Sequence, residues 1–303
     1  MMKPTLVAGL SACLVLLAAA PSFAFCRTRT CEFDQEVSCE ENPVTRCSTV
    51  GVEAYWGVGC IPFAIQRDGS RIDGISADEL RVVVQNGFDM WTNVSCGNGT
   101  PSFSVFDRGD IGCSQIEYNC DAGDANNNII MFRDSVSELE NSQLALSILT
   151  ANLETGEIFD VDIEINSRDW NFDTGGERSA SLATVMNHEL GHLLGLSHSL
   201  ERNALMRASY SGSAEPGSDD IAGVCDIFPR STRDPACNIE PLDADAACVG
   251  SKGTCRVPVQ GGETSGGCAL GAAPSPSGLG SLAALVLIGL ASARARRGRS
   301  EAA

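Results

Sequence analysis

The sequence predicts a mixed α+β domain between residues 51 and 228, flanked on each side by a cysteine-rich segment. Apolar residues recur with the period of strands in some stretches and with the period of amphipathic helices in others. Of the 303 residues, 43% are hydrophobic, which is enough to form a substantial core. Groups of cysteines lie before residue 51 and after residue 224. They indicate disulfide bonds and therefore an oxidising compartment.

The first part of the domain is predicted to contain strands and one helix. A strand over residues 54–66 is expected to break at Pro62, because proline cannot donate to a strand ladder. In the helix expected over residues 76–94, Ser76 is a suitable N-cap and Glu79 completes a capping box. Further strands are predicted over residues 128–132, 144–150 and 158–165.

The second part is predicted to be helical, over residues 182–194 and 219–228. The polar, cysteine-bearing residues 25–50 form an N-terminal segment, and the domain proper covers residues 51–230. Residues 231–267 are rich in Asp, Gly and Pro, which indicates a cysteine-held appendage or a linker.

The chain is strongly acidic, with a formal net charge of -18 and a pI near 4.5. Such a chain repels phosphate backbones, so we expect no nucleic-acid partner.

Residues 1–24 have the pattern of a secretory signal. A positive charge at Lys3 precedes an apolar run over residues 10–20, and the small residues Ser22 and Ala24 form a cleavage sequence. The alternative is a retained membrane anchor, although the apolar run is short for one. We therefore expect removal after Ala24 and a protein that is secreted or held at the cell surface.

Residues 268–303 combine a Gly-Cys start, a Pro- and Ser-rich spacer, a short apolar stretch expected to be helical over residues 282–290, and an arginine cluster. This arrangement resembles the C-terminal sorting signal of myxobacterial surface proteins. The resemblance implies cleavage near Cys268 after a transient association with the membrane. A simple tail anchor is the alternative. Without Cys13 and Cys268, twelve cysteines remain, an even number that suits disulfide pairing.

All three histidines of the chain fall within the segment from His188 to His198. His188 and His192 are four residues apart on a predicted helix, so their imidazoles lie on one face. Gly195 allows the helix to end in a left-handed conformation, so that the chain turns back and brings His198 to the same point.

Three imidazole nitrogens and a water molecule are the ligands of a catalytic Zn²⁺ ion. Glu189 follows His188 and can reach a water bound to that ion, as a general base requires. The sequence therefore predicts one catalytic zinc ion. The alternative, three histidines held by ordinary hydrogen bonds, is disfavoured by the length of the motif.

The segment from His188 to His198 resembles the metzincin peptidases and, within them, the matrixins, the family of the matrix metalloproteinases. Ser199 directly after His198 is typical of this branch, and Met206, eight residues beyond His198, resembles its Met-turn. Asp219 and Asp220 resemble the acidic start of its last helix. Taken alone, Met206 could simply fill the core, and the two aspartates could be an N-cap pair. Further upstream, Phe88, Trp91 and Phe103 resemble the first helix and the strand after it.

The resemblance implies a metzincin-type fold: a twisted, mostly parallel sheet with an antiparallel edge strand, plus three helices. It also implies that Met206 supports the zinc site from below. Residues 144–150 would be the rim strand that pairs with an extended substrate, with Leu144, Ala145 and Leu146 at the substrate. Tyr210 would line the pocket beyond the cleaved bond, while Ala208 replaces the usual proline.

The chain also departs from the family pattern. With only three histidines it cannot form the family's second, structural zinc site in the usual way. Calcium is a candidate instead, although a solvated acidic loop or strand face is the favoured alternative. The candidate calcium ligands are Asp121, Asp124, Asn126 and Asn128, or Asp160, Asp162 and Glu164. Cys47 is the nearest approach to the family's zinc-blocking cysteine, and we interpret it as a disulfide cysteine, which leaves latency unexplained.

The expected function is that of a zinc-dependent endopeptidase, acting as a monomer on protein or peptide substrates. In the expected mechanism, Glu189 takes a proton from the attacking water and passes it to the leaving amine. Another metzincin branch is disfavoured because position 208 lacks the zinc-contacting tyrosine. The alternative from a different class is a cell-surface adhesion or binding protein with a vestigial site. The intact Glu189 argues against it, because a binding protein needs no general base.

Overall fold

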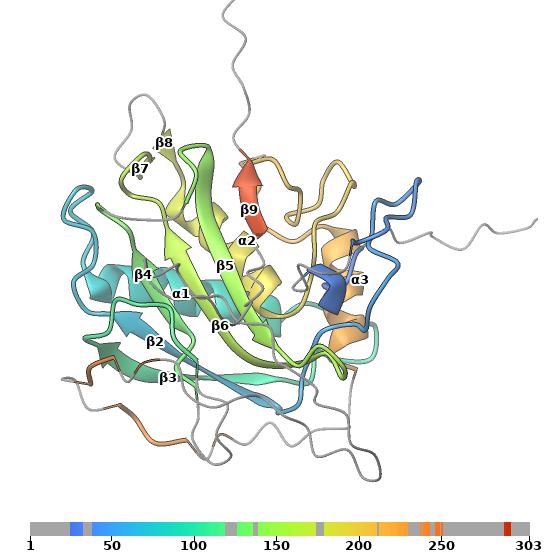
Figure 1. The fold of residues 1–303 in the computed structure, drawn as a ribbon, viewed down its shortest axis with the longest axis horizontal. Coiled ribbons are helices and arrows are strands. Elements are labelled where there is room, and N and C mark those ends of the chain that lie inside the picture. The colour runs from blue at the N-terminus through green and yellow to red at the C-terminus, as the bar shows by residue number, and fades with distance from the viewer. Residues whose placement is uncertain are drawn as a thin grey trace, which may run out of the picture.

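The fold is known from a computed structural model (Figure 1). It describes residues 25–32, 38–118, 126–135, 139–173, 179–210, 212–229, 237, 239–242, 246–248, 250 and 288–291. The predicted signal, residues 1–24, and most of the predicted sorting signal lie outside the described residues. Within the part of the chain that is described, no helix is long and apolar enough to cross a membrane.

One twisted sheet forms the centre of the molecule, in the strand order β3-β2-β4-β6-β5-β9, with β1 paired to β6. Its strands are β1 (Tyr55–Trp56), β2 (Cys60–Gln66), β3 (Ser104–Ile111), β4 (Ile129–Phe132), β5 (Gln143–Ala151), β6 (Glu157–Ile165) and β9 (Ile288–Ala291). A separate pair joins β7 (Asn171–Phe172) and β8 (Ser179–Ala180), and a 3-10 turn, η1, covers Thr30–Glu32.

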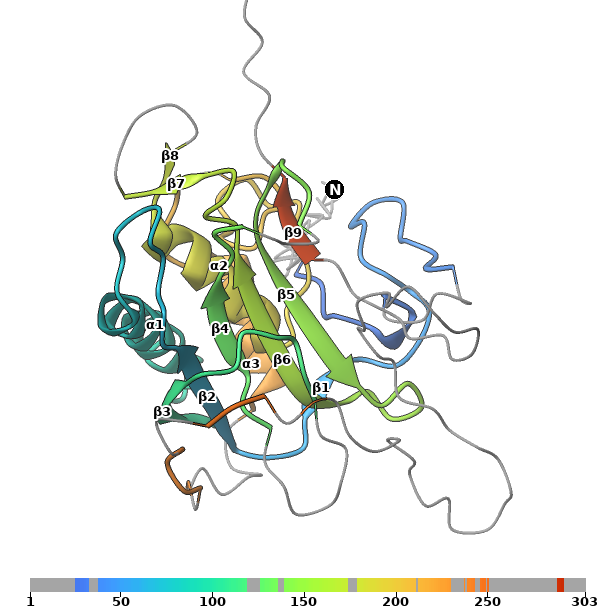
Figure 2. The same cartoon turned by 60° about the vertical axis from the view of Figure 1, so that its left-hand side comes forward.

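The strand directions agree with the fold expected from the sequence. The pairs β2/β3, β2/β4, β4/β6 and β1/β6 are parallel, and β5 is antiparallel to β6. β9 was not expected. Figures 1 and 2 both show it beside β5, and it pairs antiparallel with the edge of β5 that faces away from β6.

Three helices complete the domain: α1 (Ala77–Thr92), α2 (Leu182–Leu193) and α3 (Ser218–Ile227). α1 begins at the predicted capping box, since Ser76 Oγ accepts from the backbone N–H of Glu79 and the Glu79 carboxylate accepts from that of Ser76. Helices α1 and α2 pack against each other and against the sheet. The largest side chains between them, Phe63, Phe88 and Trp91, are completely buried.

The opposite face of the sheet is covered by the segment after the domain. Leu242 and Ala246 pack on a small apolar cluster that includes Ile129 and Met131. Backbone bonds link this segment to the sheet region, from Leu242 to Arg108 and from Gly112 to Ala246. The described part of residues 231–267 is therefore a docked appendage rather than a linker.

Five disulfides are formed by the described residues. Two of them lie within the N-terminal segment, two link the appendage to the domain, and one links α3 to the residues that follow α1. The pairs are Cys26–Cys47, Cys31–Cys39, Cys60–Cys237, Cys113–Cys248 and Cys96–Cys225. Cys47 is thus a structural cysteine, as predicted.

Two local predictions were wrong. Pro62 lies inside β2, and the strand break falls at residues 57–59 instead. The backbone N–H of Ala64 donates to Asn128 O, on the side of β2 that faces β4. The nitrogen of Pro62, two residues earlier, faces the same side. The pairing with β4 begins only at Ala64, so the missing N–H of Pro62 breaks no ladder bond with that strand. Residues 288–291 were expected in an apolar stretch of helical form, yet they form strand β9 because the exposed edge of β5 offers backbone partners.

Candidate metal centre

Helix α2 carries two of the three histidines and is fixed along both flanks. Its N-cap, Ser181, accepts from the backbone N–H of Thr184. Trp91 Nε1 of α1 donates to the backbone oxygen of Asn187 at 2.9 Å, and Trp56 Nε1 donates to that of Leu193 at 2.8 Å. Both bonds are buried, so the helix is held in position below the sheet.

The third histidine reaches the same point by the predicted turn. Gly195 has a φ of +103°, a conformation that side chains other than glycine rarely adopt. The ring centroid of His198 is 5.4 Å from that of His188 and 4.8 Å from that of His192. His188 and His192 are themselves 4.6 Å apart. The structure thus brings all three predicted ligands together.

Backbone carbonyls fix the orientation of the two helical imidazoles. His188 Nδ1 lies 2.7 Å from Leu205 O, and His192 Nδ1 lies 2.8 Å from Leu196 O. Because a carbonyl oxygen only accepts, both Nδ1 atoms carry the proton and both Nε2 atoms present a lone pair. These two Nε2 atoms are 3.0 Å apart.

This donor set fits a divalent cation. Two facing lone pairs at 3.0 Å repel each other unless a positive charge lies between them. His198 Nε2 is buried as well and has no hydrogen-bond partner. Burial lowers the pKa of His188 to about 3 and that of His198 to about 4, so both rings are neutral at neutral pH, as metal ligands must be. The three histidines form a group that can hold a metal ion.

Glu189 follows His188 on α2 and is completely buried. Its Oε2 accepts a hydrogen bond of 2.8 Å from Ser147 Oγ of β5, while its Oε1 has no partner. Burial raises the pKa of Glu189 to about 8. A cation at the histidines would lower this pKa again by favouring the ionised carboxylate. Ser147 was missed from the sequence, because a serine inside an apolar strand carries no motif.

Met206 packs against Gly191 of α2, the helix that carries His188 and His192. A Cβ atom at Gly191 would lie 2.3 Å from Met206 Sδ, so only glycine fits this position on α2. The turn around Met206 is held by Asp220 of α3, whose carboxylate accepts from the backbone N–H groups of Leu205 and Met206. Asp220 therefore positions this turn, a role that its spacing from His198 did not reveal.

The predicted substrate residues are placed less directly. Leu144, Ala145 and Leu146 lie in β5 with buried side chains, and Leu146 faces Gly289 of β9 across the backbone ladder. The hydroxyl of Tyr210 accepts from the backbone N–H of Ser181 at the start of α2. Their contact with substrate stays a prediction.

The acidic residues considered for calcium do not form a common set. Asp160, Asp162 and Glu164 lie on one face of β6 but are buried, so the solvated-face alternative is wrong for them. Both oxygens of Asp162 accept backbone N–H groups, and burial raises its pKa to about 7, while Glu164 is paired with Arg133.

The other set is only partly described. Asn128 uses its side chain to bond Pro62 O and the backbone N–H of Val161, and Asn126 donates to Phe159 O. Asp121 and Asp124 lie outside the described residues. The other possible ligand group that the described residues offer, Cys113, Glu117 and Cys248, contains a disulfide and is no metal site.

An α+β domain with three convergent imidazole nitrogens and a buried carboxylate next to one of them in sequence is typical of hydrolytic zinc enzymes. The chain belongs to the matrixin family of zinc metallopeptidases, whose profile matches residues 56–229, more than half of the sequence. It is also similar to the metalloendoproteinase 1-MMP of Arabidopsis thaliana, with 24% identity over 176 residues. This match covers 57% of the chain and 44% of that protein's length.

Proposed function

We propose that the protein is a zinc-dependent endopeptidase. The observation that carries this proposal is the convergence of His188 and His192 Nε2 atoms with the unpartnered His198 Nε2, next to the free oxygen of Glu189. A bound zinc ion would act as a Lewis acid that activates water and stabilises the developing oxyanion. His188, His192 and His198 would hold that ion.

Glu189 would act as the general base. Its free Oε1 takes the proton of the attacking water, and the same carboxylate then passes the proton to the leaving amine. Ser147 fixes the other oxygen of this carboxylate and thereby orients it. Met206, packed on Gly191, would keep the floor of the site rigid.

The edge of β5 is the proposed binding site for the peptide backbone. This edge is able to accept an antiparallel strand, because residues of β9 pair with it at Leu146 and Ser147. Ser147 also contacts Glu189, so a strand at this edge would run beside the general base.

Digestion of casein or gelatin tests the function directly. We expect the purified protein to cut both substrates at internal bonds and to lose this activity with 1,10-phenanthroline, because the chelator removes the metal. Adding back zinc should restore cleavage. A binding protein with a vestigial site, the alternative function, would digest neither substrate with or without zinc. The buried, oriented carboxylate of Glu189 favours the enzyme.

Removal of the C-terminal tail is expected to increase activity. β9 occupies the proposed substrate edge, and a tethered strand competes at an effective concentration that can reach the millimolar range. A variant that ends at Gly267 should therefore show a kcat/KM raised by about tenfold or more over a variant that ends at Ala291, which keeps β9. Equal values for the two variants would mean that β9 does not compete with substrate.

Several finer features belong to the same proposal. The protein would be exported with loss of residues 1–24 and processed near Cys268, which would release it from the membrane or leave it at the surface. It would act as a monomer. On β6, Asp160 keeps a buried oxygen, Oδ1, without a hydrogen-bond partner, whereas Asp162 accepts backbone N–H groups and Glu164 is paired with Arg133. A structural calcium ion at this strand would therefore depend chiefly on the Asp160 carboxylate.

A further inference from the structure

The disulfide-stapled N-terminal segment is built onto the loop that carries His198. The backbone N–H of Thr28 donates to Gly195 O at 2.9 Å, and that of Ser197 donates to Cys26 O at 2.8 Å. Arg27 and Leu196 form a bridge between these two bonds. The segment lies outside residues 56–229, so it is an addition to the matrixin domain.

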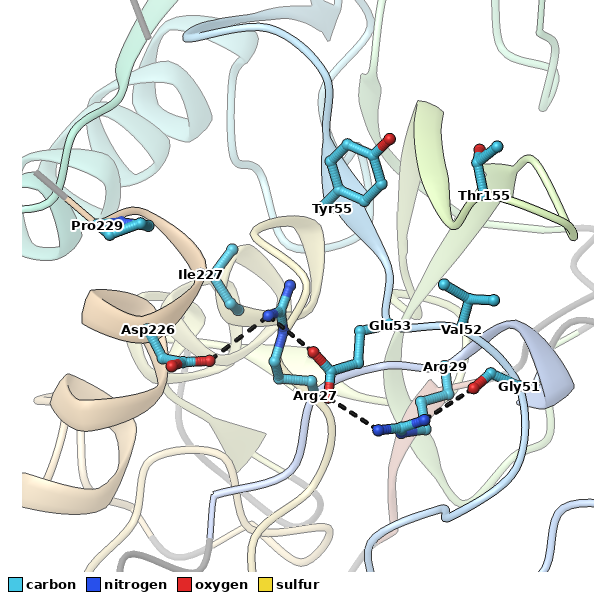
Figure 3. Close-up of a pocket in the computed structure, with 10 residues that line it drawn as sticks. All are labelled: Arg27, Arg29, Gly51, Val52, Glu53, Tyr55, Thr155, Asp226, Ile227 and Pro229. Atoms are coloured by element: carbon cyan, nitrogen blue, oxygen red, sulfur yellow. Dashed lines mark hydrogen bonds and ion pairs between the residues drawn. The ribbon is translucent and has the colours of Figure 1, made fainter. Parts of the chain in front are cut away.

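Ion pairs clamp the outer side of this segment (Figure 3). Arg27 reaches both Glu53 at 2.9 Å and Asp226 of α3 at 3.5 Å. Arg29 binds Glu53 at 2.8 Å and also donates to Gly51 O. The acidic and basic side chains that line this pocket neutralise one another. The pocket therefore holds the segment in place and is not a ligand site. The segment is thereby held rigidly against the domain.

The inner side of the segment forms one wall of a second pocket, with a volume of about 440 Å³. The other wall is the chain around His198 and the residue that replaces the family's proline, Ala208. The pocket therefore opens directly beside the proposed metal site. Its lining from the N-terminal segment comprises Glu32, Cys39, Glu41, Arg46 and Ser48.

The charges that line this pocket do not cancel. At the rim, Glu41 is paired with Arg46 at 2.7 Å. The Glu32 carboxylate is held by neutral donors: the backbone N–H of Arg29 at 3.3 Å, Ser197 Oγ at 3.4 Å and the side chain of Ser48. The guanidinium of Arg29 makes its own bonds to Glu53 and Gly51. Arg29 interacts with Glu32 electrostatically, but none of the described cations forms an ion pair with this carboxylate, which lines the pocket.

We propose that this pocket is a specificity subsite in which Glu32 binds a lysine or arginine side chain of the substrate, at a residue close to the cleaved bond. The inference rests on the proposed endopeptidase function. A cationic side chain is the occupant that the lining favours, because a partly buried anion gains most from a charge-assisted hydrogen bond. Burial also raises the pKa of Glu32, so an arriving cation would offset the cost of keeping it ionised.

The test is a set of peptides that differ at one position at a time around the cleaved bond, with Arg, Lys, Gln or Glu at that position. The wild-type protein should cleave the Arg and Lys peptides with a kcat/KM at least about tenfold above that of the Gln peptide, at one position only. Glu32→Gln should reduce this ratio to about one, and Glu32→Lys should favour the Glu peptide instead.

A matched control is Glu40→Gln, which removes an exposed carboxylate from the same N-terminal segment but not from the pocket, and it should keep the wild-type ratio. Zinc content and thermal unfolding verify that each variant is folded. No preference for basic residues in the wild type, or an unchanged preference in Glu32→Gln, would overturn the subsite and leave the peptidase function intact. Failure of the wild type to cleave any peptide would contradict the peptidase function itself.

Discussion

Replacing Glu189 with Gln is expected to lower kcat for peptide hydrolysis by about 10²–10⁴-fold, because the site loses its general base. The amide keeps the size of the carboxylate and can still accept the hydrogen bond from Ser147 Oγ. Zinc should therefore remain bound at one ion per chain. Hydrolysis is measured with a quenched fluorescent peptide, and zinc by elemental analysis of the same sample.

The control for this variant is Glu154→Gln, which changes an exposed glutamate in the turn between β5 and β6. It should leave both kcat and zinc content at the wild-type level. Unchanged hydrolysis by Glu189→Gln would remove the carboxylate from the mechanism, whatever the state of the metal.

Replacing His198 with Ala is expected to remove zinc as well as activity. His188 and His192 alone leave the ion with two protein ligands. We expect its affinity to fall by more than the roughly 10–100-fold lost when a residue that hydrogen-bonds a metal ligand is removed. At micromolar protein, dialysis should then yield less than stoichiometric zinc. Only His198→Ala should lose the metal, whereas Glu189→Gln should lose activity and keep it. Comparing the two variants therefore distinguishes a metal ligand from the general base.

Exogenous imidazole provides a further check on His198. The alanine variant leaves space where the ring was, and free imidazole can supply the missing nitrogen. We expect millimolar imidazole with zinc to restore part of the activity of His198→Ala and none to Glu189→Gln. Full zinc retention by His198→Ala would mean that this ring is not a ligand.

Features that depend on local sequence could be predicted well. The spacing of His188, His192 and His198, the capping box of Ser76 and the turn at Gly195 all involve residues that are close in the chain. Their geometry follows from the helix period and from glycine's access to positive φ. The convergence of the three histidines therefore follows from the sequence alone.

Features that depend on distant contacts could not be predicted in the same way. Cysteine spacing does not specify pairing, so the bond between Cys60 and Cys237, 177 residues apart, was not foreseen. Ser147 meets Glu189 only because β5 lies beside α2. Glu32 reaches the site through backbone bonds between Cys26, Thr28 and the loop before His198. In each case tertiary packing, rather than local pattern, creates the contact.

We expect His188, His192 and His198 to hold one zinc ion within reach of Glu189. Anomalous diffraction from crystals grown with zinc, recorded on both sides of the zinc absorption edge, tests it most directly. We predict a single strong peak about 2.0–2.1 Å from one nitrogen of each of the three histidines. Absence of a peak there, or a peak coordinated by other residues, would mean that the three histidines do not form the zinc site.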